Sequence, residues 1–303
     1  MHPDLRYLDM WADEKIHIVK PKSSGVRTID GPMAQADLIA REAPSLCEEL
    51  GCNLVIWDTA TITVRACTEE LAKSGIHKTS TTKKYTVTDS AGETVTNRVT
   101  PDRRDYFMSQ THLREAVRNQ MLLDPNRNFH LIHVLHQETA KKSAGKDAEG
   151  EPVYMATMHG PNGGGPGSVE AWGTEYRALN RIYVDQKGNH VLQLQEMADK
   201  QGVPFAARTN TGTKTPSTIN IPDTFDKSVE TWQQILKWMG IFPEDPRKGG
   251  YYSATLYGLM GSGKTRWAST LAGVPGVTGL LYIAADGDSE YLGSFWNELK
   301  GLA

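Results

Sequence analysis

The sequence predicts a single α/β domain in which a mainly parallel β-sheet is covered by helices on both faces. Three observations support this fold class: apolar runs that end in polar residues, amphipathic helical stretches between these runs, and a glycine-rich loop that joins a β-rich run to a helix. Strands that alternate with helices are typical of a parallel sheet with two buried faces. The length of 303 residues suits one large domain or two small ones.

The composition excludes several classes of protein. The net charge is −3, so any contact with nucleic acid needs a local basic patch rather than bulk charge. Cys47, Cys52 and Cys67 lack the spacing of metal ligands, and we expect them to be reduced packing residues. The N-terminus does not resemble a signal peptide, and no apolar run reaches the ~18 residues of a membrane-spanning helix. We therefore expect a cytoplasmic protein.

Helices and strands are expected along the chain that precedes the glycine-rich loop. Apolar stripes at helical spacing alternate with strand-like runs, and glycine or proline marks several of their ends. The expected elements are a helix at 33–50 that Pro44 kinks and Gly51 stops, a strand at 53–59, a helix near 105–123, a strand at 128–135, a hairpin at 183–191, and a helix at 225–239 that Gly240 ends.

The glycine-rich loop fits the phosphate-binding P-loop pattern, with a strand at 252–257 before it and a helix at 265–271 after it. Its glycines let consecutive backbone N–H groups point at phosphate oxygens. Lys264 would reach the β- and γ-phosphates of ATP, and Thr265 would place its hydroxyl on Mg²⁺. A flexible glycine loop is the structural alternative. The expected nucleotide-binding residues are Gly258, Leu259, Met260, Gly261, Ser262, Gly263, Lys264, Thr265 and Arg266.

The aspartate that a P-loop ATPase needs for its Mg²⁺ shell is expected far upstream. After the P-loop helix, the chain holds a strand at 279–285 and a helix at 289–299, and no second apolar strand that ends in aspartate. The run at 53–58 does close on Asp58. We therefore expect Asp58 to lie beside Thr265 and to share the metal with it. The alternative is an ordinary strand that meets a turn.

The strand at 128–135 supplies further candidates, because it ends in His136 and Gln137. In many P-loop ATPases a strand lies between the P-loop strand and the aspartate strand, and a polar residue at its tip senses the γ-phosphate. His136 or Gln137 would suit that role. The alternative is that these polar residues end the strand and have no functional role.

Read from about residue 246 to 303 and then from 1 to 240, the chain resembles a RecA-like ATPase of the kind that many bacteriophages encode near recombination genes. The P-loop carries the specific motif, and the other segments match by order and type. In that order they are GLMGSGKT, LYIAADGDSE, LVIWDTATIT, FHLIHVLHQ, a hairpin and FAARTNTG. The resemblance implies one circularly permuted RecA-like domain over 1–303, in which 1–240 is the aspartate-strand part, 241–250 a linker and 251–303 the P-loop part. An unrelated N-terminal domain followed by a P-loop fragment is the competing arrangement.

The resemblance also implies catalytic residues. The family carries a general base at the end of the strand after the P-loop helix, where Asp286 stands here, and Glu290 is a second candidate. The family more often has glutamate at this point, and the shorter aspartate implies slow turnover. Arg208 matches a family segment whose basic residue points at the nucleotide of a neighbouring subunit, which implies a homo-oligomer. A solvated arginine is the alternative.

The expected function is Mg²⁺-dependent ATP binding and hydrolysis in phage DNA recombination or single-stranded DNA handling, with a single-strand annealing or binding protein as a further partner. A small-molecule P-loop kinase and a nucleotide-dependent scaffold with little hydrolysis are the alternatives. A basic insertion arm at 76–104, with a hairpin at 84–100, could track a phosphate backbone. A loop at 160–167 between His159 and Trp172 is the second DNA candidate, and two solvated loops are the structural alternative. The basic residues of the arm are Lys78, Lys83, Lys84, Arg98, Arg103 and Arg104.

Overall fold

The computed structural model describes residues 8–13, 16–21, 32–74, 82–83, 87–88, 94–95, 98–99, 103–146, 152–161, 178–194, 216 and 218–284. Several expectations from the sequence lie outside these residues. They concern Arg208, Asp286, Glu290, Trp172, the helix at 289–299 and most of the loop at 160–167.

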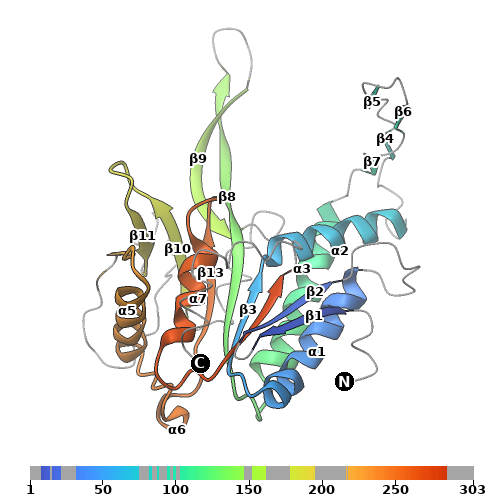
Figure 1. Cartoon of the computed structure of the whole chain (residues 1–303). Coiled ribbons are helices and arrows are strands. Elements are labelled where there is room, and N and C mark those ends of the chain that lie inside the picture. Colours follow the sequence, from blue (N-terminus) through green and yellow to red (C-terminus); the bar gives the residue numbers. More distant parts are fainter. Residues whose placement is uncertain are drawn as a thin grey trace.

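A ten-stranded sheet forms the centre of the molecule, in the order β1-β2-β14-β3-β8-β13-β10-β11-β12, and β9 pairs with β8 outside this path (Figure 1). The neighbouring strands from β2 to β10 all run parallel, whereas the remaining pairs are antiparallel. The predicted α/β class with a mainly parallel sheet is confirmed. The strands are β1 Leu8–Asp13, β2 Ile16–Pro21, β3 Leu54–Asp58, β8 His130–Lys146, β9 Pro152–Pro161, β10 Ala178–Val184, β11 His190–Gln193, β12 Thr218–Asn220, β13 Ser253–Gly258 and β14 Leu280–Ala284.

Helices cover both faces of the sheet, as predicted (Figure 1). Alternate residues of β3 divide between the faces: Leu54 and Ile56 pack with α5 and α7, whereas Val55 and Trp57 pack with α1, α2 and α3. All five residues of β3 are buried, which explains why it is a continuous apolar run. The helices are α1 Pro32–Leu50, α2 Ala60–Ser74, α3 Arg103–Val117 with a π-helical turn Arg118–Leu122, α5 Phe225–Trp238, α6 Pro246–Gly249, and α7 Lys264–Ser269 with a 3-10 turn Thr270–Gly273.

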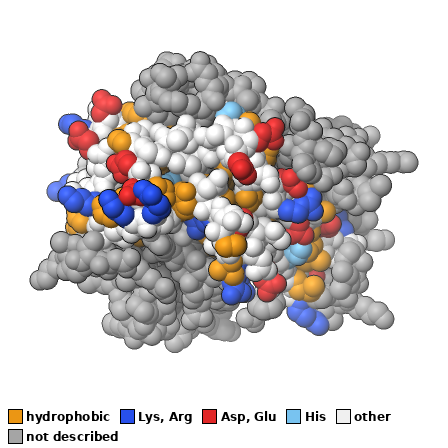
Figure 2. All heavy atoms as spheres, turned by 90° about the horizontal axis from the view of Figure 1, so that it is seen from below, with side chains coloured by type: hydrophobic (Ala, Val, Ile, Leu, Met, Phe, Trp, Pro, Cys, Tyr) orange, Lys and Arg blue, Asp and Glu red, His pale blue; other side chains and the backbone are white. Residues whose placement is uncertain are grey.

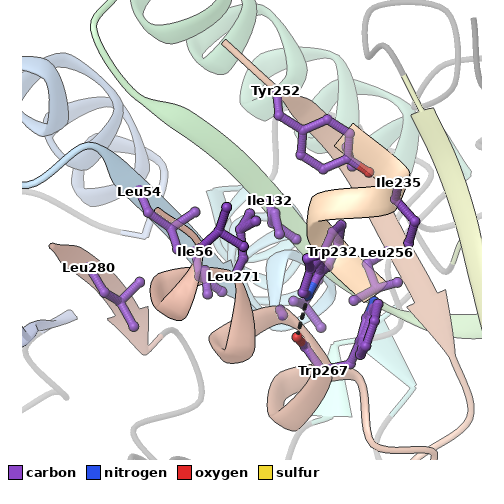
Figure 3. Packing of buried hydrophobic residues seen from close by; sticks show 14 of the residues in the cluster. Leu54, Ile56, Ile132, Trp232, Ile235, Tyr252, Leu256, Trp267, Leu271 and Leu280 are labelled. Atoms are coloured by element: carbon purple, nitrogen blue, oxygen red, sulfur yellow. Dashed lines mark hydrogen bonds between the residues drawn. The ribbon is translucent and has the colours of Figure 1, made fainter. Parts of the chain in front are cut away.

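Two tryptophans fix α7 against α5 (Figure 3). The rings of Trp232 and Trp267 stack at 4.7 Å between centroids, with 18° between their planes. Trp232 Nε1–H donates to the backbone oxygen of Trp267 at 3.1 Å, and Tyr252 meets Trp232 edge-on at 5.8 Å. Such aromatic pairs contribute about 0.5–1.5 kcal/mol each beyond the burial of their area. The helix that follows the P-loop is therefore held firmly from one side.

The helix ends agree with the sequence. α1 contains Pro44 and is followed by Gly51, whose φ is 67°. α5 ends in a left-handed Gly240 with a φ of 68°, and the next residue, Ile241, donates its N–H to Leu236 O at 2.9 Å. Both glycines adopt a conformation that other residues rarely take, so each predicted stop is confirmed.

The predicted end of the strand at 128–135 is wrong. β8 begins at His130 and continues to Lys146, because β9 pairs with it from Gln137 onward. Figure 1 shows β8 and β9 rising together as a long hairpin above the sheet. Local sequence could not show this extension, because it depends on a partner strand that comes later in the chain.

The segment at 241–250, predicted as a linker, packs into the domain. Ile241 is buried in the core with α5. A Cβ on Gly249 would lie 2.0 Å from Gly240 O, and a Cβ on Gly276 would lie 2.4 Å from the backbone of Pro243. Asp245 pairs with Arg247 and Lys248 on the surface here. Figure 2 shows the molecule from below relative to Figure 1, and on this side the described basic, acidic and hydrophobic side chains are interspersed.

The structure describes only part of the predicted basic arm. β4 Thr82–Lys83 pairs with β7 Arg98–Val99, and β5 Val87–Thr88 pairs with β6 Thr94–Val95, both antiparallel. These pairs confirm a hairpin, which stands away from the sheet in Figure 1. The assignment of Arg103 and Arg104 to this arm is wrong, because both lie in the first turn of α3. Helix α3 therefore begins where the arm was expected to end.

Candidate functional site

The glycines of the loop after β13 are required by space and by backbone conformation. A Cβ on Gly258 would lie 2.3 Å from Ile182 O and 2.6 Å from Ser262 Oγ, so a larger residue does not fit there. Gly261 and Gly263 have φ angles of 75° and 84°, in the left-handed region. The loop therefore turns back tightly over the end of β13 before α7 begins.

Lys264 is folded into the same loop. Its side chain is buried, and Nζ donates to Leu259 O at 2.8 Å. Burial lowers the pKa of Lys264, and the nearby Asp58 carboxylate partly opposes that change. A buried ammonium costs free energy unless it is paired, so an anion in this loop would stabilise it.

Asp58 and Thr265 meet beside the loop although 207 positions separate them in the sequence. Thr265 Oγ1 donates a hydrogen bond to Asp58 Oδ2, and the hydroxyl of Tyr282 donates to the same oxygen at 3.0 Å. Asp58 is only 2 % exposed. The predicted proximity of Asp58 and Thr265 is confirmed. Tyr282 was missed, because a tyrosine within an apolar run looks like a core residue.

The strand between β13 and β3 is β8, as predicted. His136 of β8 is level with Gly258 of β13, and its backbone N–H donates to Thr61 Oγ1 at 2.9 Å. Burial lowers the pKa of His136, and the positive charges of Lys264 and Arg65 lower it further. His136 is therefore neutral at pH 7. Its role in sensing phosphate stays a prediction.

Gln137 is held by a residue that the sequence did not single out. Arg181 Nε donates to Gln137 Oε1 at 2.8 Å, and the Arg181 guanidinium also lies 5.2 Å from the centre of the Tyr183 ring. Arg181 is level with Tyr257, one position before the P-loop. The sequence predicts only a hairpin at 183–191, and no local signal distinguishes Arg181 from other strand residues.

A second unpredicted contact supports the loop from the other side. His190 Nδ1 lies 2.9 Å from Ser262 O, so this nitrogen must carry the proton and donate it to the carbonyl. A Cβ on Gly263 would lie 3.3 Å from the same nitrogen. Arg266 reaches away from the loop, and its Nη2 donates to Asp223 O at 2.6 Å. The P-loop is thus fixed at Ser262 by β11.

The polar groups fit a magnesium ion that arrives with phosphate. Within the described residues, no group of three or more His, Cys, Asp and Glu side chains is arranged to hold a metal ion. Mg²⁺ commonly takes one or two protein ligands and completes its shell with substrate phosphates and water. Thr265 and Asp58 supply one hydroxyl and one carboxylate, which is a donor set of that kind.

Both predicted catalytic carboxylates lie outside the described residues. β14 ends at Ala284, which is level with Asp58, and Asp286 and Glu290 follow outside the described residues. Arg208 also lies outside them.

Among the described helices, none is long and apolar enough to cross a membrane. Comparisons of the chain with family models, curated proteins and solved structures found no match.

Proposed function

We propose that this protein binds a nucleoside triphosphate, expected to be ATP, together with Mg²⁺, and hydrolyses it. The observation that carries the proposal is the hydrogen bond from Thr265 to Asp58 beside the buried Lys264. A glycine loop of purely structural use would need no buried cation and no carboxylate next to its threonine. The buried ammonium of Lys264 would be stabilised by an anion, and the Asp58 carboxylate beside Thr265 would be stabilised by a cation, so their meeting favours a site for phosphate together with Mg²⁺.

The proposal includes a RecA-like domain in circularly permuted order. The sheet order β13-β8-β3 supports it, because a strand separates the P-loop strand from the aspartate strand. The aspartate strand comes before the P-loop in the chain, which is the reverse of the usual order. The described loop at 241–250 would then be the point where the family's original ends are joined.

The residues divide the proposed chemistry among them. Backbone N–H groups of the loop and Lys264 would hold the phosphates, and Thr265 and Asp58 would hold Mg²⁺. Mg²⁺ held there would supply charge neutralisation to the phosphates. Neutral His136 can accept a hydrogen bond from water or donate one to phosphate, and Arg181 keeps Gln137 oriented. The proposed base is Asp286, or else Glu290.

We extend the proposal to single-stranded DNA and, following the family resemblance, to phage recombination. In the arm, Lys83 of β4 is directly opposite Arg98 of β7 in the register. The register brings two basic residue types to paired positions of one hairpin. Basic residues on a projecting hairpin could neutralise the phosphates of a nucleic acid, so the arm is the proposed DNA contact.

Binding of ATP by the full-length chain is the direct test. Lys264→Ala should weaken binding by about 10- to 100-fold, because it removes a charged hydrogen-bond donor. Lys248→Ala is the matched control, since Lys248 is a surface lysine on α6 with a 69 % exposed side chain. Equal affinity of the Lys264→Ala variant and the wild type for ATP would reject the proposal. Stimulation of ATPase by single-stranded DNA would support the DNA role, and turnover only with a small acceptor would indicate a kinase instead.

A further inference from the structure

The hairpin of β10 and β11 brings a histidine to the side of the P-loop that faces away from Asp58. Ile182 of β10 is level with Gly258, the first residue of the loop, and Val184, two residues further on, pairs with His190 of β11. In the sheet, β11 and β3 lie on opposite sides of β13. His190 therefore stands beside the loop, across from the strand that carries the Asp58 carboxylate.

The backbone that carries His190 is tied at both of its neighbours. The Asp185 carboxylate closes the turn before it, because it accepts the N–H groups of Lys187 and Asn189 at 2.8 and 2.9 Å. On the other side, the N–H of Ile221 donates to His190 O at 2.8 Å. A side chain on such a paired strand is placed more precisely than one on a loop.

The hydrogen bond from His190 fixes the orientation of one peptide in the P-loop. Nδ1 of His190 lies 2.9 Å from Ser262 O and donates to it, since a carbonyl oxygen can only accept. In a planar trans peptide the C=O and the N–H point in opposite directions. The Gly263 N–H belongs to the same peptide as Ser262 O. This N–H therefore points away from His190 and β11.

The next carbonyl of the loop is held as well. Trp267 N–H donates to Gly263 O at 2.9 Å, which ties this oxygen into the first turn of α7. A Cβ on Gly263 would lie 3.3 Å from His190 Nδ1, so the ring rests against the backbone itself. A carbonyl oxygen aimed at a phosphate would repel it, whereas an N–H would bind it. Both hydrogen bonds disfavour the repulsive orientation.

We propose that His190 is a positioning residue of the phosphate site, which holds the Ser262–Gly263 peptide so that the Gly263 N–H faces the phosphates. The inference rests on the proposed function. Glycine adopts φ angles of either sign with similar ease, so Gly263 by itself would let this peptide turn over and aim its oxygen at the ligand. His190 supplies the restraint that the glycine lacks, and it acts through the loop without touching the nucleotide.

The test titrates the full-length chain with ATP and with inorganic tripolyphosphate, both with Mg²⁺, by calorimetry. His190→Leu removes the donor and keeps much of the bulk, and it should weaken the binding of both ligands by about 3- to 10-fold. His190→Asn places an amide nitrogen two bonds from Cβ, as Nδ1 is, and should restore both affinities to within about twofold of wild type. Gln186→Leu is the matched control, because Gln186 is an exposed residue of the same turn.

The ¹⁵N–¹H resonance of Gly263 gives a second readout that a loss of packing alone would not reproduce. Tripolyphosphate should shift this resonance in the wild type and in His190→Asn, because the N–H meets the phosphate in both. The shift should be clearly smaller in His190→Leu at a ligand concentration that saturates each variant.

Selective weakening in His190→Leu, with recovery in His190→Asn and the control within about twofold of wild type, supports the inference. Unchanged affinities in His190→Leu, equal losses in the leucine and asparagine variants, an equal loss in the control, or a loss for ATP without one for tripolyphosphate would each overturn the inference alone. A wild-type chain that binds neither ligand would overturn the proposed function and the inference together.

Discussion

Two histidines buried in β8 predict a steep loss of stability in mild acid. Burial lowers the pKa of His133 to about 3, and burial together with the charge of Arg127 lowers that of His130 to about 3, from an ordinary value of 6.5. His130 Nδ1 also accepts the backbone N–H of Tyr252 at 2.9 Å, which only the neutral ring can do on that nitrogen. The folded chain therefore keeps both rings neutral.

The sign and size of the effect follow from proton linkage. As the pH falls below 6.5, the unfolded chain binds protons that the folded chain does not, so unfolding becomes more favourable. At pH 5 each ring should cost about 2 kcal/mol of unfolding free energy relative to pH 7, or about 4 kcal/mol together. The loss continues down to a pH of about 3, where the folded rings also become protonated.

Urea unfolding at pH 7 and pH 5 checks this prediction. Carboxylates titrate over the same range, so the informative quantity is the difference between wild type and a variant that lacks one ring. His133→Leu and His133→Gln should each lose about 2 kcal/mol less than the wild type between the two pH values. If both variants lose as much as the wild type, His133 is protonated in the folded chain and the reasoning fails. Two replacements of different polarity separate titration from packing.

The remaining predictions concern the proposed site and the arm. Asp58→Asn should remove most of the dependence of ATP binding on Mg²⁺ while ATP still binds, as titrations with and without the metal would show; undiminished Mg²⁺ dependence would place the metal elsewhere. Gln137→Leu removes the hydrogen bond from Arg181 and should lower turnover with little change in ATP affinity. Steady-state kinetics would then show a lower kcat and an almost unchanged KM. Replacing Lys83 and Arg98 by glutamine should lower the log–log salt slope of single-stranded DNA binding by about 0.7 for each phosphate that the arm no longer neutralises. Arg104→Gln in α3 is the control, and an equal effect there would remove the case for the arm.

The sequence was sufficient where a local rule determines the structure. The tight turn of the glycine-rich loop could be predicted because its glycines are fixed by sterics, as the close approach of Ile182 O to Gly258 shows. The contact between Asp58 and Thr265 could be predicted because the P-loop hypothesis needs a carboxylate, and the sequence after the loop helix offered no second apolar strand that ends in aspartate. The helix stops at Gly51 and Gly240 follow from left-handed backbone conformations.

The residues that were missed owe their positions to strand register between distant segments. Arg181 meets Gln137 across the P-loop strand, and His190 meets Ser262 across 72 positions of sequence. Tyr282 reaches Asp58 from β14. None of these interactions has a local signature, because each depends on which strands are neighbours. The extension of β8 was missed for the same reason.

The proposed permutation is physically inexpensive for such a site. The contact between Thr265 and Asp58 depends on where β3 and α7 lie in the sheet, and not on the path by which the chain connects them. If the two ends of the sequence were joined and the chain were opened within 241–250, the stretch of chain between Asp58 and Thr265 would be roughly half as long. Each doubling of the length of a flexible loop costs only about 0.6 kcal/mol in closure entropy. The six buried parallel strands that position the site contribute far more than this difference. A permutant opened within 241–250 should therefore keep the affinity for ATP within a few-fold, whereas loss of binding would mean that the packed loop around Ile241 is needed to hold α5 against α7.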